Sequence, residues 1–177
     1  MIFLFLISIF STAQIPKTFE NKNRNIRNLQ ELSNDIVIIH VNDVHCGLIE
    51  TLGYDGFVLY RNELKKKYKY VITVDVGDHV QGGTLGSISL CMAMIEIMNK
   101  FEFDVAILGN HEFDYGVEQL NKFQENIANK YVCANFYFRK NHTRILDPYK
   151  IITCGDKKVA FIGVVTSLTM SKIYYLL

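Results

Sequence analysis

The chain has 177 residues, of which 49% are hydrophobic, and its 19 basic and 18 acidic residues nearly cancel. This length is enough for one domain of ordinary size with a sizeable core. A net charge of +1 excludes a chain-wide basic surface, so we expect no nucleic-acid partner.

The first 13 residues predict a secretory signal peptide. Residues 1–10 are almost entirely apolar, and Ser11-Thr12-Ala13 supplies small residues at the positions that a signal peptidase reads. The apolar block is shorter than the roughly 20 residues that a spanning helix needs, so we interpret it as a signal peptide and not as a membrane anchor. The sequence therefore predicts a secreted or cell-surface protein with no stable membrane span.

A polar segment separates this block from the first predicted strand. Residues 14–35 are rich in Asn, Lys and Arg, which predicts a flexible leader. Residues 36–41 form a β-branched run that is typical of a buried strand. Residues 57–67 then place apolar side chains at helical spacing, with lysines opposite, which predicts a surface helix.

The rest of the chain continues this alternation and ends in a hairpin pattern. A run that is apolar nearly all round predicts a helix covered on several sides, and two short strands around a Gly-Asp turn predict a β-hairpin. The order predicts an α/β fold with a largely parallel, helix-covered sheet, and the hairpin predicts that the sheet is mixed. We expect strands at residues 70–74, 104–108, 131–135, 150–153 and 159–165, and helices at residues 87–100 and 117–129.

Four cysteines would meet an oxidising compartment if the chain is exported. Cys46, Cys91, Cys133 and Cys154 have a spacing that fits no zinc motif, and three pairings are open. Cys91 lies in an apolar helical run and is interpreted as a buried core residue, whereas Cys133 and Cys154 lie in predicted strands and could pair. The glycosylation sequon at residues 141–143 agrees with export.

Polar side chains follow three successive predicted strands. Asp43 and His45 follow the first strand, Asp78 follows the second, and Asn110 and His111 follow the third. The carboxyl ends of parallel strands meet at one edge of a sheet, where ligands are held. Each pair alone is also ordinary turn chemistry, but three strand ends in order indicate a metal site. A mixture of carboxylate, imidazole and amide groups suits Zn, Mn or Fe better than Ca.

Neighbouring polar residues are expected to support this site. Asp114 follows His111 by three residues and is close enough to orient its imidazole. His40 and His79 are interpreted as structural or supporting residues rather than direct ligands.

Three stretches of this chain resemble the 5'-nucleotidases within the calcineurin-like metallophosphoesterases. They are VNDVHCG at residues 41–47, VDVGD at residues 74–78 with QGG at residues 81–83, and GNHEFDYG at residues 109–116. The resemblance runs from about residue 36 to about residue 166. It implies the N-terminal part of a four-layer α/β/β/α sandwich with mixed sheets, and a partial metallophosphoesterase domain over residues 36–177.

The resemblance also implies a two-metal phosphohydrolase that acts on nucleotides. Its cofactors are two divalent metal ions, with Zn or Mn favoured and Fe, Co or Mg as alternatives. His111, paired with Asp114, is the implied catalytic histidine, which stabilises developing charge and helps to protonate the leaving group. The implied reaction is attack of metal-bound hydroxide on a phosphate monoester. The implied metal ligands are Asp43, His45 and Asp78 for the first ion, and Asp78 and Asn110 for the second.

Part of the family's pattern is not found in this sequence. In the family, two or three further histidines complete the metal shells and a C-terminal domain grips the nucleoside, whereas His142 is the one histidine after His111 here. We therefore interpret the chain as a truncated nucleotidase with weakened metal binding. Two alternatives stay open: an enzyme of the same superfamily acting on UDP-sugars, nucleoside diphosphates or cyclic nucleotides, and a non-catalytic secreted fragment.

Overall fold

The computed structural model describes residues 2–4, 32–49, 52–166 and 169. The predicted signal peptide at residues 1–13 and the predicted leader at residues 14–35 fall largely within residues 5–31, which lie outside the described residues. Among the described residues, no helix combines the length and the apolar character that crossing a membrane requires.

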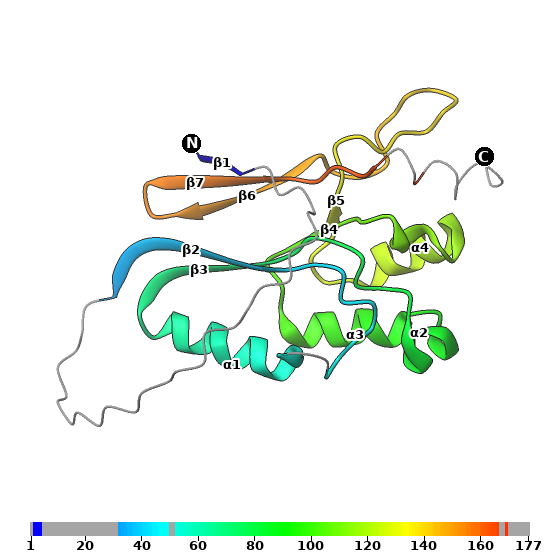
Figure 1. Ribbon diagram of the computed structural model, residues 1–177. Helices are drawn as coiled ribbons and strands as arrows, with labels where there is room; N and C mark the ends of the chain where they lie inside the picture. Colours follow the sequence, from blue (N-terminus) through cyan, green and yellow to red (C-terminus); the bar gives the residue numbers. More distant parts are fainter. Residues whose placement is uncertain (1, 5–31, 50–51, 167–168, 170–177) are drawn as a thin grey trace.

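A four-stranded parallel sheet forms the centre of the fold (Figure 1). Its strands follow one another in chain order, because each crossover adds the next strand beside the last one: β2 (Ser33–Val41), β3 (Tyr68–Asp75), β4 (Val105–Ile107) and β5 (Tyr131–Val132). Val41 pairs with Asp75, and Asp75 pairs in turn with Ala106. The strands therefore end close together, and the loops that follow β2, β3 and β4 leave the sheet at one edge.

Four helices cover one face of this sheet: α1 (Gly53–Lys65), α2 (Gly83–Ser89), α3 (Met92–Phe101) and α4 (Gly116–Asn126) (Figure 1). Successive side chains of a strand point to opposite faces of the sheet, so every second side chain faces the helices. Ala106 of β4 joins Met94 and Ile95 of α3 and Phe123 of α4 in one buried cluster. The helical layer is thus held to the sheet by an apolar core.

A second sheet covers the opposite face, in the order β1 (Ile2–Leu4), β7 (Lys157–Ile162), β6 (Tyr149–Cys154). Val74, Val105 and Ile107 of the parallel sheet share a separate buried cluster with Val159 and Phe161 of β7. β6 and β7 pair antiparallel, which confirms the predicted hairpin. The hairpin belongs to this second sheet and leaves the helix-covered sheet parallel throughout. The expected α/β class is confirmed, and the described residues form three stacked layers of the α/β/β/α order.

The helix predicted at residues 87–100 is in fact two helices. Leu90 and Cys91 have φ angles of 46° and 61°, which end α2 and turn the chain into α3. The Leu90 carbonyl accepts a hydrogen bond from Gln119 Nε2 at 2.8 Å, a contact from α4. The prediction was wrong here because the break depends on this distant contact, and the local apolar pattern shows no interruption.

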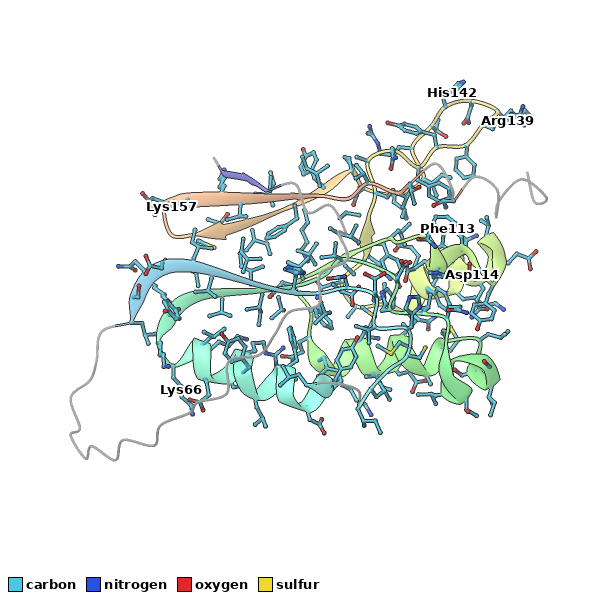
Figure 2. All side chains as sticks on the ribbon, in the orientation of Figure 1. Lys66, Phe113, Asp114, Arg139, His142 and Lys157 are labelled. Carbon is cyan, nitrogen blue, oxygen red and sulfur yellow. The ribbon has the colours of Figure 1, made fainter. Side chains whose placement is uncertain are left out.

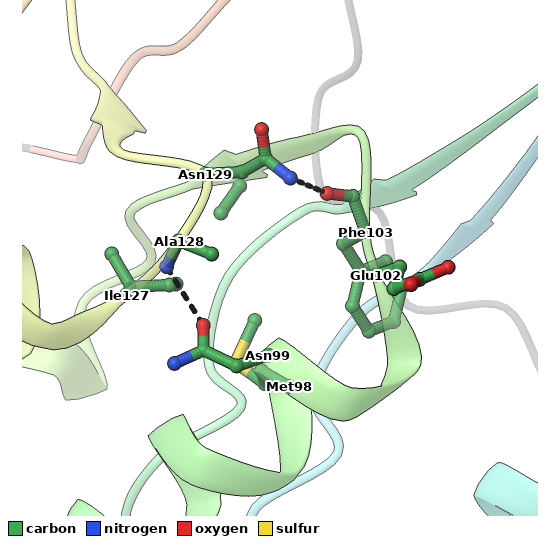
Figure 3. A pocket seen from close by; sticks show the side chains of 8 residues that line it. Met98, Asn99, Glu102, Phe103, Ile127, Ala128 and Asn129 are labelled. Carbon is green, nitrogen blue, oxygen red and sulfur yellow. Dashed lines mark hydrogen bonds between the residues drawn. The ribbon is translucent and has the colours of Figure 1, made fainter.

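Asparagine side chains fasten the end of α3 to the segment between α4 and β5 (Figure 3). Asn99 accepts a hydrogen bond from the Ala128 backbone N at 2.7 Å and donates to the Asn126 carbonyl at 2.9 Å. Asn129 donates to the Phe103 carbonyl. These residues line a small pocket that lies beside the amino end of β4. The predicted site residues follow the carboxyl ends of the strands, so this pocket is not part of their site.

The segment between β5 and β6 carries an exposed loop, with Arg139 and His142 near its tip (Figure 2). Asn141 Oδ1 accepts hydrogen bonds from the Thr143 backbone N and hydroxyl, at 3.1 and 2.8 Å. The predicted sequon therefore lies in a local turn on the surface.

Candidate metal and catalytic site

The loops that follow β2 and β3 run side by side, because backbone pairing continues past the ends of these strands. The backbone N–H groups of Asp43, His45 and Cys46 donate to the carbonyls of Gly77, Asp78 and His79, at 3.1, 3.0 and 3.0 Å. This extended pairing brings His45 beside Asp78, although the two residues are 33 positions apart in the sequence.

These two loops hold backbone conformations that ordinary residues avoid. Asp43, His45 and Asp78 have φ angles of 55°, 48° and 55°, in the left-handed region. Each such residue costs about 1 kcal/mol or more, because Cβ crowds the carbonyl oxygen. Strain of this kind persists where the surroundings fix it, and it clusters at functional sites.

The loop after β4 packs closely against the loop after β3, because glycines at two positions leave room for the backbones to approach. A Cβ atom on Gly109 would lie 2.2 Å from Asp78 Oδ1, and one on Gly77, whose φ is +101°, would lie 2.3 Å from the Gly109 N. A side chain at either position would push the loops apart. The His111 backbone N donates to Asp78 Oδ1 at 2.7 Å, which ties the third loop to the second.

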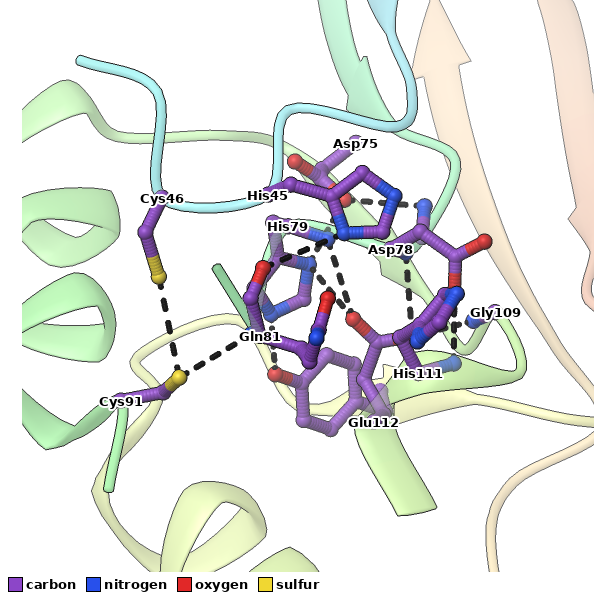
Figure 4. Close-up of polar contacts among 12 residues, drawn as sticks. His45, Cys46, Asp75, Asp78, His79, Gln81, Cys91, Gly109, His111 and Glu112 are labelled. Carbon is purple, nitrogen blue, oxygen red and sulfur yellow. Dashed lines mark hydrogen bonds and ion pairs between the residues drawn. The ribbon is translucent and has the colours of Figure 1, made fainter. Parts of the chain in front are cut away.

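His45, Asp78 and His111 meet at this edge of the sheet (Figure 4). Each offers one ligand atom, and these atoms all lie within 4.8 Å of one another. The two imidazole rings stand edge to face with centroids 4.7 Å apart. Two nitrogen donors and one carboxylate oxygen form a set that suits Zn, Mn or Fe. The donor chemistry of this group therefore fits a divalent transition-metal ion.

The other two predicted ligands lie in the same loops. The Asp43 carboxylate lies outside the group of three and accepts a hydrogen bond from Asn42 Nδ2 at 2.5 Å. Asn110 precedes the short helix η1 (His111–Phe113) and lies between Gly109 and His111. The roles of Asp43 and Asn110 as ligands stay predictions.

His111 is in contact with Asp114 through the side chains. Its Nδ1 lies 2.5 Å from Asp114 Oδ2, and the two side chains are 30% and 20% exposed. This is the contact by which a carboxylate fixes the ring of a histidine and favours the proton on Nδ1. Phe113 and Asp114 lie beside the start of α4 (Figure 2). The pair is thus oriented and still accessible to a substrate.

Glu112 is a supporting residue that the sequence did not single out. It is fully buried, and its carboxylate accepts hydrogen bonds from the backbone N–H groups of Asp78, His79 and Gly109, at 3.1, 3.1 and 2.5 Å. Burial raises the pKa of Glu112, while the charge of His79 opposes part of this rise. The buried Glu112 carboxylate therefore links the loop after β3 to the loop after β4. The adjacent His111 was the only signal in the sequence that pointed to it.

His79 lies beneath the site, as its predicted supporting role requires. Its Nδ1 lies 2.9 Å from Asp75 Oδ1, and its Nε2 lies 2.6 Å from the Tyr131 hydroxyl. Burial alone would lower the pKa of His79, but the Asp75 and Glu112 carboxylates outweigh it and raise the pKa to about 9. A buried positive charge on His79 thus lies beside two buried carboxylates.

Comparisons with known proteins connect this chain with one family. The calcineurin-like phosphoesterase family matches residues 36–173. A snake venom 5'-nucleotidase from Crotalus adamanteus is 33% identical over 153 residues, which cover 76% of this chain and 26% of that protein. An NAD 5'-nucleotidase from Haemophilus influenzae is 30% identical over 149 residues, which cover 75% of this chain and 25% of that protein. The chain therefore spans about a quarter of the length of these relatives.

Solved structures show the same likeness in three dimensions. A 5'-nucleotidase precursor from Thermus thermophilus gives a TM-score of 0.66 at 26% identity, over 76% of this chain and 29% of that one. The Haemophilus influenzae NAD nucleotidase also gives a TM-score of 0.66, at 30% identity, over 75% of this chain and 26% of that one.

Proposed function

The chain belongs to the calcineurin-like phosphoesterase family, and from this premise we propose that it hydrolyses the phosphate monoester of a nucleotide as a metal-dependent 5'-nucleotidase. The observation that carries the proposal is the convergence of His45, Asp78 and His111 from three separate loops. Nucleotidases among the relatives support a nucleotide as the substrate.

The proposed cofactors are two divalent ions, Zn or Mn, with Fe, Co or Mg as alternatives. When bound, such ions supply positive charge against the phosphate and lower the pKa of a water molecule. Asp43, His45 and Asp78 are proposed to hold the first ion, and Asp78 and Asn110 the second. The nitrogen and oxygen donors of His45 and Asp78 support this assignment, because they lie together where strained loops fix them.

His111 and Asp114 are the proposed catalytic pair. With Nδ1 directed at the Asp114 carboxylate, Nε2 is the ring nitrogen left to meet a phosphate oxygen or the leaving alkoxide. The Asp114 carboxylate fixes the orientation of the ring, so His111 is placed to deliver a proton to the leaving group. The partial exposure of both side chains supports direct contact with substrate.

Phosphate release from AMP tests this function. The purified chain should release phosphate when Mn or Zn is present, and the rate should fall by about 100-fold or more in Asp78→Asn and His111→Ala. The exposed His142 offers the matched control, and His142→Ala should retain the wild-type rate. An equal rate in all four proteins, or no metal-dependent release by the wild type, would overturn the proposal.

A second candidate substrate is a dinucleotide such as NAD. It is favoured by the 30% identity with the Haemophilus influenzae protein, whose name describes an NAD 5'-nucleotidase. NAD can be assayed beside AMP with the same variants. If the chain cleaves the pyrophosphate bond of NAD faster than the monoester of AMP, the dinucleotide becomes the proposed substrate. The same site residues would still be required.

We also propose that the protein acts outside the cell, on the basis of the apolar segment at residues 1–10 and the small residues that follow it. Two snake venom relatives agree with an exported enzyme. The chain can be expressed in a secreting eukaryotic host, and the protein recovered from the medium can be sequenced from its N-terminus. We expect this protein to begin after Ala13. Retention of the full-length chain in the cells would contradict export.

A further inference from the structure

Two cysteines lie in contact beside the candidate metal site, and nothing in the proposed hydrolysis uses them. Cys46 Sγ and Cys91 Sγ are 3.6 Å apart, and the side chains are 8% and 0% exposed. Cys46 follows the β2 strand in the loop that carries His45, and Cys91 forms the break between α2 and α3 (Figure 4). We propose that Cys46 and Cys91 form a disulfide bond that links these two segments.

The surroundings of the two sulfur atoms favour this bond. A Cβ atom on Gly86 would lie 2.8 Å from Cys46 Sγ and 3.2 Å from Cys91 Sγ, so a larger residue there would separate the sulfurs. The Cys91 backbone N donates to the Gly86 carbonyl at 2.9 Å, and the Cys46 backbone N donates to the His79 carbonyl at 3.0 Å. Both backbones are therefore held by hydrogen bonds, with the two sulfur atoms 3.6 Å apart.

The other two cysteines are placed differently. Cys133 lies in the buried cluster on the helix side of the parallel sheet, where its Sγ contacts Asn135 Oδ1 at 3.4 Å. Cys154 lies in the cluster between the two sheets. The pairing that the sequence left open for them does not fit this placement, because different cores enclose the two side chains. Cys91 is buried as predicted, but it also touches another cysteine.

The bond can form by exchange with a low-molecular-weight disulfide such as oxidised glutathione. Cys46, the more exposed of the two, loses its proton as it attacks one sulfur of glutathione disulfide, and one glutathione leaves as a thiol. The Cys91 thiolate then attacks Cys46 Sγ, the protein S–S bond forms, and the second glutathione leaves. Two protein thiols lose two protons and two electrons, and glutathione disulfide takes up both to become two glutathione thiols. The Gln81 backbone N, 3.0 Å from Cys91 Sγ, stabilises the attacking thiolate.

The bond would restrain His45 from two directions. Cys46 is its neighbour in the chain, and the Gln81 carbonyl lies 3.2 Å from His45 Nδ1 while its N–H contacts Cys91. A covalent link at Cys46 and Cys91 would therefore fix the loop that presents the imidazole. This inference stands on the thiol geometry and does not require the proposed hydrolysis.

Peptide mapping tests the bond directly. The folded wild-type chain is incubated with oxidised glutathione, unfolded, alkylated and digested with trypsin under non-reducing conditions. Cleavage after Lys and Arg places each cysteine on its own peptide, namely residues 28–61, 70–100, 131–139 and 151–157. We expect the first two peptides to be joined and the last two to be alkylated. We also expect a higher melting temperature for the oxidised chain than for the reduced chain.

Two variants complete the test. Cys91→Ser should leave Cys46 alkylated or joined to glutathione, with no joined peptides, whereas Cys154→Ser should give the same joined pair as the wild type. Alkylation of all four wild-type cysteines after oxidation would overturn the proposal, as would a bond that involves Cys133 or Cys154. The wild-type map decides the question by itself, so the test stays conclusive even if a variant fails to fold.

Discussion

At the scale of single residues, Glu112 holds the site together through the backbone. Its buried carboxylate accepts three backbone N–H groups from two loops. Glu112→Gln keeps the shape but removes the charge and one acceptor, so unfolding free energy should fall by about 2–3 kcal/mol. Urea denaturation measures this change, and Glu118→Gln on the exposed face of α4 is the matched control. A loss equal to that of the control would show that the three contacts contribute little.

The role of His111 can be separated from that of His45 by two readouts. If His111 has the proposed catalytic role, it should be required for turnover and not for metal affinity. His111→Ala is expected to lower the rate of phosphate release by about 100-fold or more while calorimetric metal affinity stays within a few-fold of the wild type. His45→Ala should lose both. If His111→Ala loses metal affinity as severely as His45→Ala, then His111 is a ligand, as its place in the group of three also allows.

At the scale of elements, the junction between the loops after β3 and β4 depends on Gly109. A methyl group there would overlap Asp78 Oδ1, so Gly109→Ala should displace the carboxylate. We expect a loss of about 1–3 kcal/mol in unfolding free energy, together with weaker metal binding. Gly83→Ala is the control, since its Cβ would meet nothing within 4 Å and only its φ of +57° resists substitution. Calorimetry should show wild-type metal affinity for Gly83→Ala. Wild-type metal affinity in Gly109→Ala would contradict the proposed role of this junction.

The strands and the order of the loops could be predicted from the sequence, because apolar runs such as residues 36–41 and 70–74 are local patterns. The run at residues 36–41 was expected to be buried, but it lies in the edge strand β2 and no residue of it is fully buried. Three polar strand ends in succession also predicted where His45, Asp78 and His111 would meet. The contacts of Glu112 and the break at Leu90 could not be predicted, because each depends on residues about 30 positions away in the chain. Local patterns also could not predict that the hairpin belongs to a separate second sheet, because this depends on the hairpin packing against one face of the parallel sheet.

At the scale of the whole molecule, the charge buried under the site predicts how stability varies with pH. The pKa of His79 is raised in the folded state from an ordinary value of 6.5 to about 9, so folding favours its protonated form. The stabilisation is complete below pH 6.5 and is lost as pH rises through about 9, a change on the order of 3 kcal/mol. Urea denaturation of the metal-free chain across this range should show the decline.

A variant of Asp75 checks the cause of this pH dependence. Asp75→Asn removes a carboxylate that raises the pKa of His79, so stability should decline less steeply between pH 6.5 and 9 than in the wild type. A wild-type stability that is flat or rises over this range would show that His79 is neutral in the folded chain. An unchanged slope in Asp75→Asn would assign the decline to other groups.

The central claim is that distant loops of this chain converge to bind divalent metal, and calorimetric titration with Zn or Mn tests it most directly. The wild type should bind the ion saturably, and affinity should fall by about tenfold or more in His45→Ala and in Asp78→Asn. His142→Ala, altered in the exposed loop before β6, should bind as the wild type does. Binding that is equal in all four proteins, or absent from the wild type, would contradict the claim.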